Sequence, residues 1–161
     1  PILNQKEVGI RENDTCSILT NRLFRVGASL LLETLDKRVK GKIQAIDQDD
    51  SLATYTHLFK KDDGLINWNS TSKKISLSTR AFNPWPGTYT FLNGKILKII
   101  EAQPVSYPVL KPGMISMDQN FFAGTGKGTL QLNNVQLEGK KKTSGKDFAK
   151  GRANLNGKEL G

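Results

Sequence analysis

Residues 88–99, TYTFLNGKILKI, contain the strongest local folding signal in the chain. Segments rich in aromatic and aliphatic residues stand on both sides of Asn93-Gly94. Asn and Gly adopt the positive φ angles that a tight hairpin turn requires, so this stretch predicts two antiparallel strands joined by that turn. A hairpin at this position makes a β domain the expected fold for the second half of the chain.

Several short apolar segments follow the hairpin and are separated by turn residues. They are PGMISMD (112–118), FFAG (121–124) and TLQLNNVQL (129–137). TSGKDFAKGRA (143–153) then predicts a short helix, capped by Thr143 or by Ser144. Short strands with turns about every 8–12 residues are typical of small β-barrels. We therefore expect a mostly β fold, an OB-like β-barrel with short helices.

The glycine-rich segment GTGKGT (124–129) invites comparison with a phosphate-binding loop. Only Thr125 separates its first glycine from the Gly-Lys pair, and the P-loop spacer is longer. A strand pattern also follows it, where a P-loop would be followed by a helix. We interpret the segment as a turn between two strands.

The segment NSTSKKISLSTRAFNPWPG (69–87) predicts a short helix that stops at a proline. Ser70 or Ser72 is the expected N-cap. Pro84 disfavours helical geometry at the residue before it and therefore ends the helix. Trp85, between two prolines, is expected to plug one end of the barrel.

The beginning of the chain combines a strand pattern with a long amphipathic helix pattern. ILNQKEVGI (2–10) predicts a strand. Asp14 or Thr15 is the expected cap of the helix that follows. One strand and one helix cannot bury an apolar face by themselves. That face is formed by Ile18, Leu19, Leu23, Val26, Leu30, Leu31 and Leu35, which recur at helical spacing.

These patterns divide the chain into parts. Residues 1–41 are expected to be the C-terminal remnant of a larger α/β (Rossmann-like) domain. Residues 42–58 have weak periodicity and are interpreted as a linker, and residues 59–161 as the OB-like domain. A first residue that is Pro1 instead of methionine is typical of a processed or excised piece.

The composition is typical of a soluble globular protein, with 37% apolar and 24% charged residues. No apolar run reaches the roughly 20 residues that cross a bilayer, so no membrane association is expected. Cys16, the only cysteine, is expected to be a small buried thiol. His57, the only histidine, has no carboxylate cluster around it, and no catalytic residue, cofactor-binding residue or metal ligand is assigned in this chain.

The positive charge is confined to the second part of the chain. Residues 1–58 hold eight basic and eight acidic residues, whereas residues 59–161 hold sixteen basic and seven acidic ones. The whole net charge of +9 therefore belongs to the second part. Such an asymmetry is typical of a chain in which one part binds a polyanion, and the alternative is a solubilising surface charge.

The candidate contacts to a polyanion are basic residues that would concentrate at one rim of the barrel. Aromatic residues make up only 7% of the chain, so we expect contacts to the backbone of a folded RNA more than base stacking. The candidates for contact with a folded RNA are Lys60, Lys61, Arg80, Lys140, Lys141, Lys142, Lys146, Lys150 and Arg152.

Three segments resemble the C-terminal half of the methionyl-tRNA formyltransferase family. DQDDSLATYTHLFKKDDGLINW (47–68) is similar to the family's linker and domain entry. RAFNPWPGTYT (80–90) resembles its Arg-Ala-Phe-Asn-Pro-Trp-Pro-Gly signature, and VQLEGKKKTSGKDFAKG (135–151) resembles its closing segment. A fourth part, ILNQKEVGI (2–10) and the helix pattern after it, resembles the end of the family's folate-binding domain. The likeness thus spans nearly the whole chain, and its parts come in the family's order.

The resemblance implies a parent enzyme that transfers a formyl group from 10-formyltetrahydrofolate to the amine of initiator Met-tRNA, for translation initiation. It implies that tRNA and a missing N-terminal folate-binding domain are the partners of a monomeric chain, in the bacterial cytoplasm or an organellar matrix or stroma. The family's Asn-x-His-x-Ser-Leu-Leu-Pro motif and its catalytic Asp are absent from this sequence. The chain alone is therefore expected to be inactive, with no cofactor of its own.

Two alternatives remain open. One is the equivalent domain of another folate-dependent formyltransferase, which acts on a nucleotide-sugar or on water. The other is a free-standing RNA-binding OB-like module without an enzyme parent.

Overall fold

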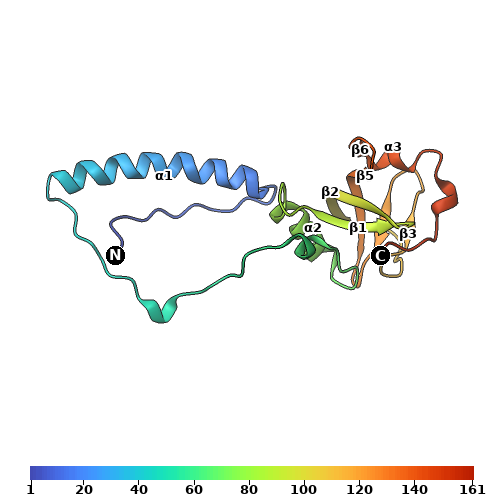
Figure 1. Cartoon of the computed structure of the whole chain (residues 1–161), viewed down its shortest axis with the longest axis horizontal. Coiled ribbons are helices and arrows are strands. Elements are labelled where there is room, and N and C mark those ends of the chain that lie inside the picture. The colour runs from blue at the N-terminus through green and yellow to red at the C-terminus, as the bar shows by residue number, and fades with distance from the viewer. The chain divides into compact units, whose positions relative to one another are not determined.

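The computed structural model describes all 161 residues, which form two compact units, Pro1–Leu58 and Phe59–Gly161 (Figure 1). The first unit contains helix α1 (Cys16–Val39) and the 3₁₀ helix η1 (Asp50–Leu52). None of the helices combines the length and the apolar character that a bilayer crossing requires. The second unit contains η2 (Lys61–Gly64), α2 (Ser72–Ala81), β1 (Thr88–Leu92), β2 (Lys95–Val105), β3 (Ile115–Ser116), β4 (Phe122–Gly124), β5 (Thr129–Leu137), β6 (Thr143–Ser144), α3 (Gly145–Ala149) and η3 (Ala153–Leu155).

Helix α1 begins at one of the two expected caps. The Thr15 hydroxyl accepts a hydrogen bond from the amide of Ile18 at 3.3 Å, which satisfies one of the free amides at the helix start. Asp14 has a different role, because its carboxylate pairs with Arg22 and accepts a hydrogen bond from the Arg11 amide. These contacts hold the pKa of the Asp14 carboxyl below its usual value.

The strand predicted over residues 2–10 is wrong. Only Ile2 pairs, through an isolated antiparallel bridge to Ile46 with backbone hydrogen bonds of 2.7 and 2.8 Å. A strand needs a neighbouring strand to satisfy its backbone groups. The first unit contains no strand that could serve as this neighbour.

The apolar face of α1 is not enclosed. Leu19, Val26 and Leu30 are half-buried, while Leu23 and Leu31 are exposed. The buried thiol expected at Cys16 is also wrong, since this side chain is exposed. The first unit offers one helix and irregular segments, which cannot cover a helix face of this length.

The second unit is built on one antiparallel sheet of six strands in the order β1-β2-β5-β4-β3, with β6 paired to the last part of β5. Figure 1 shows the sheet curled, with α3 near β5 and β6. The predicted fold class, a mostly β domain with a barrel-like sheet and short helices, is confirmed.

The predicted turns and caps of the second unit are largely confirmed. Asn93 and Gly94 join β1 to β2 with φ angles of 50° and 74°, as a two-residue hairpin requires. The GTGKGT segment is the turn between β4 and β5, and Ser144 caps α3. The N-cap of α2 is Thr71, which lies between the two predicted caps.

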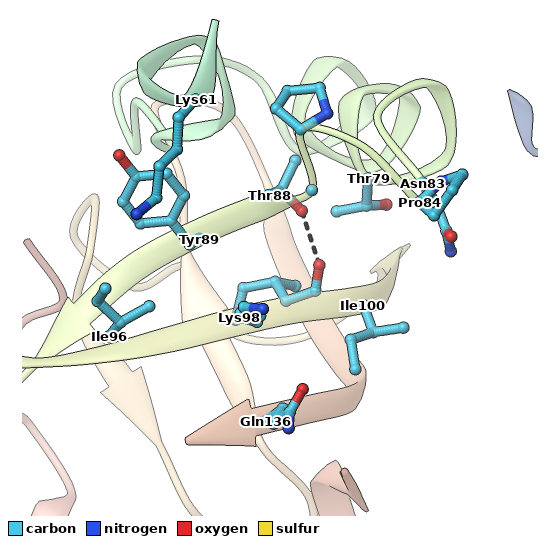
Figure 2. A pocket seen from close by; sticks show the side chains of 13 residues that line it. Lys61, Thr79, Asn83, Pro84, Thr88, Tyr89, Ile96, Lys98, Ile100 and Gln136 are labelled. Carbon is cyan, nitrogen blue, oxygen red and sulfur yellow. Dashed lines mark hydrogen bonds between the residues drawn. The ribbon is translucent and has the colours of Figure 1, made fainter. Parts of the chain in front are cut away.

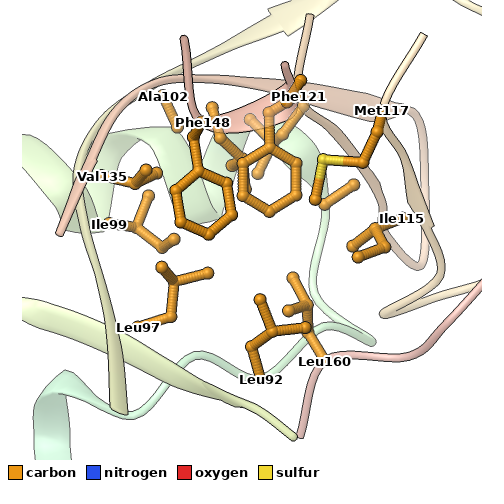
Figure 3. Packing of buried hydrophobic residues seen from close by; sticks show 14 of the residues in the cluster. Leu92, Leu97, Ile99, Ala102, Ile115, Met117, Phe121, Val135, Phe148 and Leu160 are labelled. Carbon is orange, nitrogen blue, oxygen red and sulfur yellow. The ribbon is translucent and has the colours of Figure 1, made fainter. Parts of the chain in front are cut away.

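The core of the second unit lies inside the curled sheet (Figure 3). The rings of Phe121 and Phe148 stack with centroids 5.2 Å apart. Trp68 is buried, and its indole N–H donates to the Thr90 hydroxyl at 3.1 Å. Trp85 is 61% exposed, so the prediction that it plugs the barrel is wrong. A tryptophan ring inside a core requires a partner for its N–H, and Trp68 has one in Thr90.

The C-terminal segment connects the two ends of the open sheet. The amide of Gly161 donates to the carbonyl of Phe91 in β1 at 3.1 Å. The amide of Leu160 donates to the carbonyl of Gly113, just before β3, at 2.9 Å. Because Leu160 is also buried in the core, the last residues hold the two edges of the sheet, β1 and β3, near each other.

Candidate nucleic-acid interface

Three polar side chains form a row across the outer face of the sheet. Tyr89 of β1 pairs with Lys98 of β2, and Lys98 pairs in turn with Gln136 of β5. The neighbours of Lys98 in β2, Leu97 and Ile99, are buried, while Lys98 is exposed. Successive side chains of a strand point to opposite faces, so the row Tyr89-Lys98-Gln136 lies on the face away from the core.

The row lies in a pocket of about 500 Å³ on the outer face of the sheet (Figure 2). Figure 2 shows strands β1 and β2 as its floor, with segments before β1 above them. No aspartate or glutamate lines this pocket. The lining residues are Lys61, Thr79, Asn83, Pro84, Pro86, Gly87, Thr88, Tyr89, Ile96, Lys98, Ile99, Ile100 and Gln136.

Two smaller hollows continue from this pocket. The first, of about 220 Å³, shares Lys98 and Gln136 with the pocket and extends to Glu138. The second, of about 260 Å³, shares Leu137 with the first and extends to Arg152. The shared residues show that the hollows adjoin one another. We call the three together the basic track. Its cations are Lys61, Lys98, Lys140, Lys141 and Arg152.

The turn after β5 presents three consecutive lysines, Lys140 to Lys142, all exposed. Its backbone is held by a hydrogen bond from the Lys140 amide to the Leu137 carbonyl at 2.9 Å. The side-chain amide of Gln136 also donates to the Lys140 carbonyl at 3.0 Å. A fixed backbone with free ammonium groups suits contacts to phosphates, which require charge more than shape.

Helix α3 carries a local ion pair. Lys150 lies 2.6 Å from Asp147, and Asp147 also accepts a hydrogen bond from the Ser144 hydroxyl at 2.7 Å. The bond from Lys150 and then that from Ser144 hold the pKa of the Asp147 carboxyl below its usual value. The charge of Lys150 is thus partly balanced within the chain, which makes it a weaker candidate for a phosphate contact.

Arg152 is held in place more firmly than the lysines. Its guanidinium donates to the Phe148 carbonyl at 2.6 Å and lies 4.4 Å from the centroid of the Phe148 ring. Phe148 is itself fixed in the core by Phe121. A pre-positioned guanidinium loses little side-chain freedom when it binds an anion, which favours binding.

The structure groups only part of the predicted contacts. Lys61, Lys140, Lys141 and Arg152 line the basic track. The other five predicted contacts line none of the three hollows. They are Lys60 before η2, Arg80, which is half-buried at the end of α2, Lys142 in the turn after β5, and Lys146 and Lys150 at α3.

Sequence reasoning missed the row Tyr89-Lys98-Gln136. The alternation of buried Leu97 and Ile99 around Lys98 was the available signal, because it marks Lys98 as facing outward. The contribution of Gln136 was not available from local pattern. It depends on the pairing of β2 with β5, which are separated by more than twenty residues in the chain.

A family comparison places this architecture among known proteins. The model of the formyl transferase C-terminal domain matches residues 58–153. The chain belongs to this family. The formyl transferase C-terminal domain therefore includes both strands of the hairpin and the complete basic track.

Curated relatives support the same assignment. The chain is 40% identical over 153 residues to a methionyl-tRNA formyltransferase of Thermodesulfovibrio yellowstonii. This alignment covers 94% of this chain and 49% of the relative. It is 37% identical over 164 aligned residues to a methionyl-tRNA formyltransferase of Dehalococcoides mccartyi. This alignment covers 100% of this chain and 52% of the relative. The chain thus spans about half the length of the relatives it matches, and the resemblance to the C-terminal half of that family is confirmed.

A solved structure shares the fold at lower sequence similarity. HypX from Aquifex aeolicus aligns with a TM-score of 0.65 and 18% identity, over 89% of this chain and 27% of HypX. A second crystal structure of HypX is a complex with tetrahydrofolic acid. At this level of identity the likeness shows the fold alone.

Proposed function

We propose that this chain corresponds to the C-terminal half of a methionyl-tRNA formyltransferase and that its second unit holds the tRNA. In this proposal, residues 1–41 are the end of the formyl-transferring domain, residues 42–58 a linker and residues 59–161 the tRNA-binding domain. The protein would act in translation initiation, in the bacterial cytoplasm or in an organelle, with initiator Met-tRNA and 10-formyltetrahydrofolate as substrates.

The basic track is the observation that carries this proposal. It connects five cations along one surface, and the second unit holds all of the chain's excess positive charge. A nucleic acid backbone bound there would release counterions, so its affinity would fall steeply with salt. Cations on the sheet and on the segments around it suit a folded RNA, whose phosphates are presented in a fixed three-dimensional arrangement.

The chain itself does not provide a formyl-transfer site. Its single histidine, His57, is exposed and lines none of the hollows of the basic track. No group of three or more His, Cys, Asp or Glu side chains is placed to hold a metal ion. Because the family's Asn-x-His-x-Ser-Leu-Leu-Pro motif and its catalytic Asp are absent from this sequence, the proposal assigns the formyl-transfer chemistry to the other half of the parent enzyme.

The test is the salt dependence of tRNA binding by the 161-residue chain. The triple variant Lys140→Ala/Lys141→Ala/Lys142→Ala removes the lysine turn. It should weaken binding and reduce the slope of log K against log salt by about 2–3, roughly one for each phosphate that is no longer neutralised. Fluorescence anisotropy with initiator tRNA at several salt concentrations measures both quantities.

A matched control removes the same charge elsewhere. Lys73, Lys74 and Lys158 are exposed and line none of the hollows of the basic track. Their triple alanine variant has the same net charge as the first one. If both variants change the slope equally, the effect comes from net charge, and the lysine turn is not part of the interface. If the unmodified chain fails to bind tRNA, the proposed function fails.

A further inference from the structure

We propose that the pocket around the row Tyr89-Lys98-Gln136 binds one unpaired nucleotide of the RNA. The base would lie against Tyr89 and the isoleucines of β2, and the phosphate between Lys61 and Lys98. This assignment rests on the proposed function, because it names the part of the RNA that enters this pocket. The nucleotide site would contact a base, whereas the rest of the basic track suits contacts to the phosphate backbone of the RNA.

The size and shape of the pocket fit a single nucleotide. Its volume of about 500 Å³ lies within the roughly 300–1,000 Å³ range of small-molecule pockets. The other two hollows of the basic track are about half as large. A duplex is too wide to enter such a pocket, whereas an unstacked base from a loop or an end can be inserted into it.

The charge of the pocket favours a phosphate. Lys61 and Lys98 are exposed, and neither forms an ion pair within the chain. The other two hollows each contain an acid, Glu138 in one and Asp147 in the other. This pocket has no acid in its lining, so it is the part of the basic track where an anion meets the least repulsion.

The floor of the pocket provides a surface for a base. The ring of Tyr89 is oriented by an edge contact with Phe91, with centroids 5.9 Å apart and an interplanar angle of 85°. Ile96 and Ile100 lie on either side of Lys98 along β2 and supply apolar surface to the same pocket (Figure 2). Stacking of a base on an aromatic ring is tolerant of base identity and stabilises the binding of single strands.

Two amide side chains at the rim can read the edge of the base. Asn83 and Gln136 both line the pocket, and each carries a donor and an acceptor. Gln136 already donates through its nitrogen to the Lys140 carbonyl. Its oxygen remains available as an acceptor, which links base recognition to the position of the lysine turn.

The first experiment maps nucleotide binding on the isotope-labelled 161-residue chain by NMR. Adenosine 5′-monophosphate should shift the amides of Tyr89, Lys98 and Gln136 in a saturable way, and more than those of residues 140–152. Adenosine alone and inorganic phosphate alone should each bind at least about fivefold more weakly, since each lacks one half of the contact. Absence of shifts in the pocket, or equal binding of phosphate alone, would overturn the proposal.

The second experiment compares two lysines of the same strand. Lys98→Gln should weaken binding of both adenosine monophosphate and tRNA by about three- to tenfold, because it removes one phosphate contact. Lys95→Gln removes the same charge from an exposed position of β2 outside the pocket and should change either affinity less than about twofold. Equal effects of the two substitutions on tRNA would contradict the assignment.

A third comparison isolates the ring. Tyr89→Phe keeps the stacking surface and the fold, and it should retain the affinity for adenosine monophosphate. Tyr89→Leu should reduce it by about fivefold or more. If the leucine variant binds as well as the phenylalanine variant, the base does not contact this ring.

The outcomes separate this inference from the proposed function. Binding of tRNA by the unmodified chain together with a pocket that ignores adenosine monophosphate overturns the nucleotide site and leaves the tRNA-binding function intact. Binding of adenosine monophosphate in the pocket without any tRNA binding overturns both the RNA origin of the nucleotide and the proposed function.

Discussion

In the second unit Phe121, Leu130 and Leu132 are completely buried, whereas α1 of the first unit leaves Phe24 75% and Leu32 71% exposed. Both regions have regular secondary structure with well-formed caps. The difference is that the curled sheet encloses its own apolar side chains, and a single helix cannot. Regular local structure is therefore no measure of how much a region stabilises itself, because most helix stability in proteins comes from packing.

The two units also differ in charge. The first unit is electrically balanced, and the second holds the whole net charge of +9. The balanced unit has an uncovered apolar face, which suits burial against other protein. The charged unit encloses its own hydrophobic core, and its basic surface suits a polyanionic partner. The contrast leads to four predictions.

The largest expected effect concerns the two units as separate polypeptides. Residues 59–161 should unfold in one cooperative transition, because this unit has its own core. Residues 1–58 should show a gradual loss of helix without a cooperative transition, because α1 has no core to join. Circular dichroism during heating measures both. A sharp transition in residues 1–58 would show that the first unit stabilises itself.

The second prediction compares two phenylalanines. Phe121→Ala should lower the free energy of unfolding of the second unit by about 3–5 kcal/mol, because it leaves a cavity in a closed core. Phe24→Ala should change stability by less than about 0.5 kcal/mol, since this side chain is mostly exposed. Urea denaturation of the full chain, followed by tryptophan fluorescence for the second unit and by circular dichroism for α1, provides the measurement. Similar losses of unfolding free energy in the two variants would show that the two units do not differ in how they bury their side chains.

The third prediction uses two glycines for which the same substitution has opposite signs. A Cβ at Gly145 would lie 1.8 Å from the Leu132 carbonyl oxygen, so Gly145→Ala should destabilise the second unit by about 2 kcal/mol or more. A Cβ at Gly27 would meet nothing within 4 Å, and Gly27→Ala should strengthen α1 by up to about 1 kcal/mol.

Two readouts check this pair. Thermal unfolding should show a lower midpoint for the Gly145 variant, and circular dichroism should show more helix for the Gly27 variant. Loss of helix in the Gly27 variant would mean that another part of the protein approaches α1 at this position.

The smallest expected effect is a pH dependence at α3. Asp147 has a lowered pKa in the folded state because of Lys150 and Ser144, so it stabilises the fold at pH values above its usual pKa of 3.8. This contribution is lost as the pH falls below 3.8 and through the lower folded value. Asp147→Asn should therefore reduce stability at neutral pH and flatten the decline of stability on acidification.

Stability of the second unit as a function of pH tests this point. The parent and the Asp147→Asn variant should differ at neutral pH, and the difference should shrink as the pH falls below 3.8 and the carboxyl of the folded state becomes protonated. A constant difference over the whole range would mean that Asp147 acts through its hydrogen bonds to Ser144 alone and that its charge is unimportant.

The sequence was most informative where a structure is decided within a few residues. The Asn93-Gly94 turn and the caps at Thr15 and Ser144 depend on hydrogen bonds or φ angles between neighbours. The turn was predicted directly, and each cap was predicted as one of two adjacent residues. Predictions failed where a distant partner decides. The strand over residues 2–10 failed because no neighbouring strand is present in its unit. Trp85 was expected to plug the barrel and is exposed, whereas Trp68 is buried.

The candidate interface follows the same division. The sequence by itself determined the family, the sign and location of the charge, and the lysine turn at residues 140–142. Only the tertiary structure decided that Lys61, Lys98 and Gln136 share one pocket and that Lys150 is paired with Asp147. The physical reason is that charge and turn chemistry are properties of adjacent residues, whereas the face on which a side chain lies depends on strand register and on packing between segments far apart in the chain.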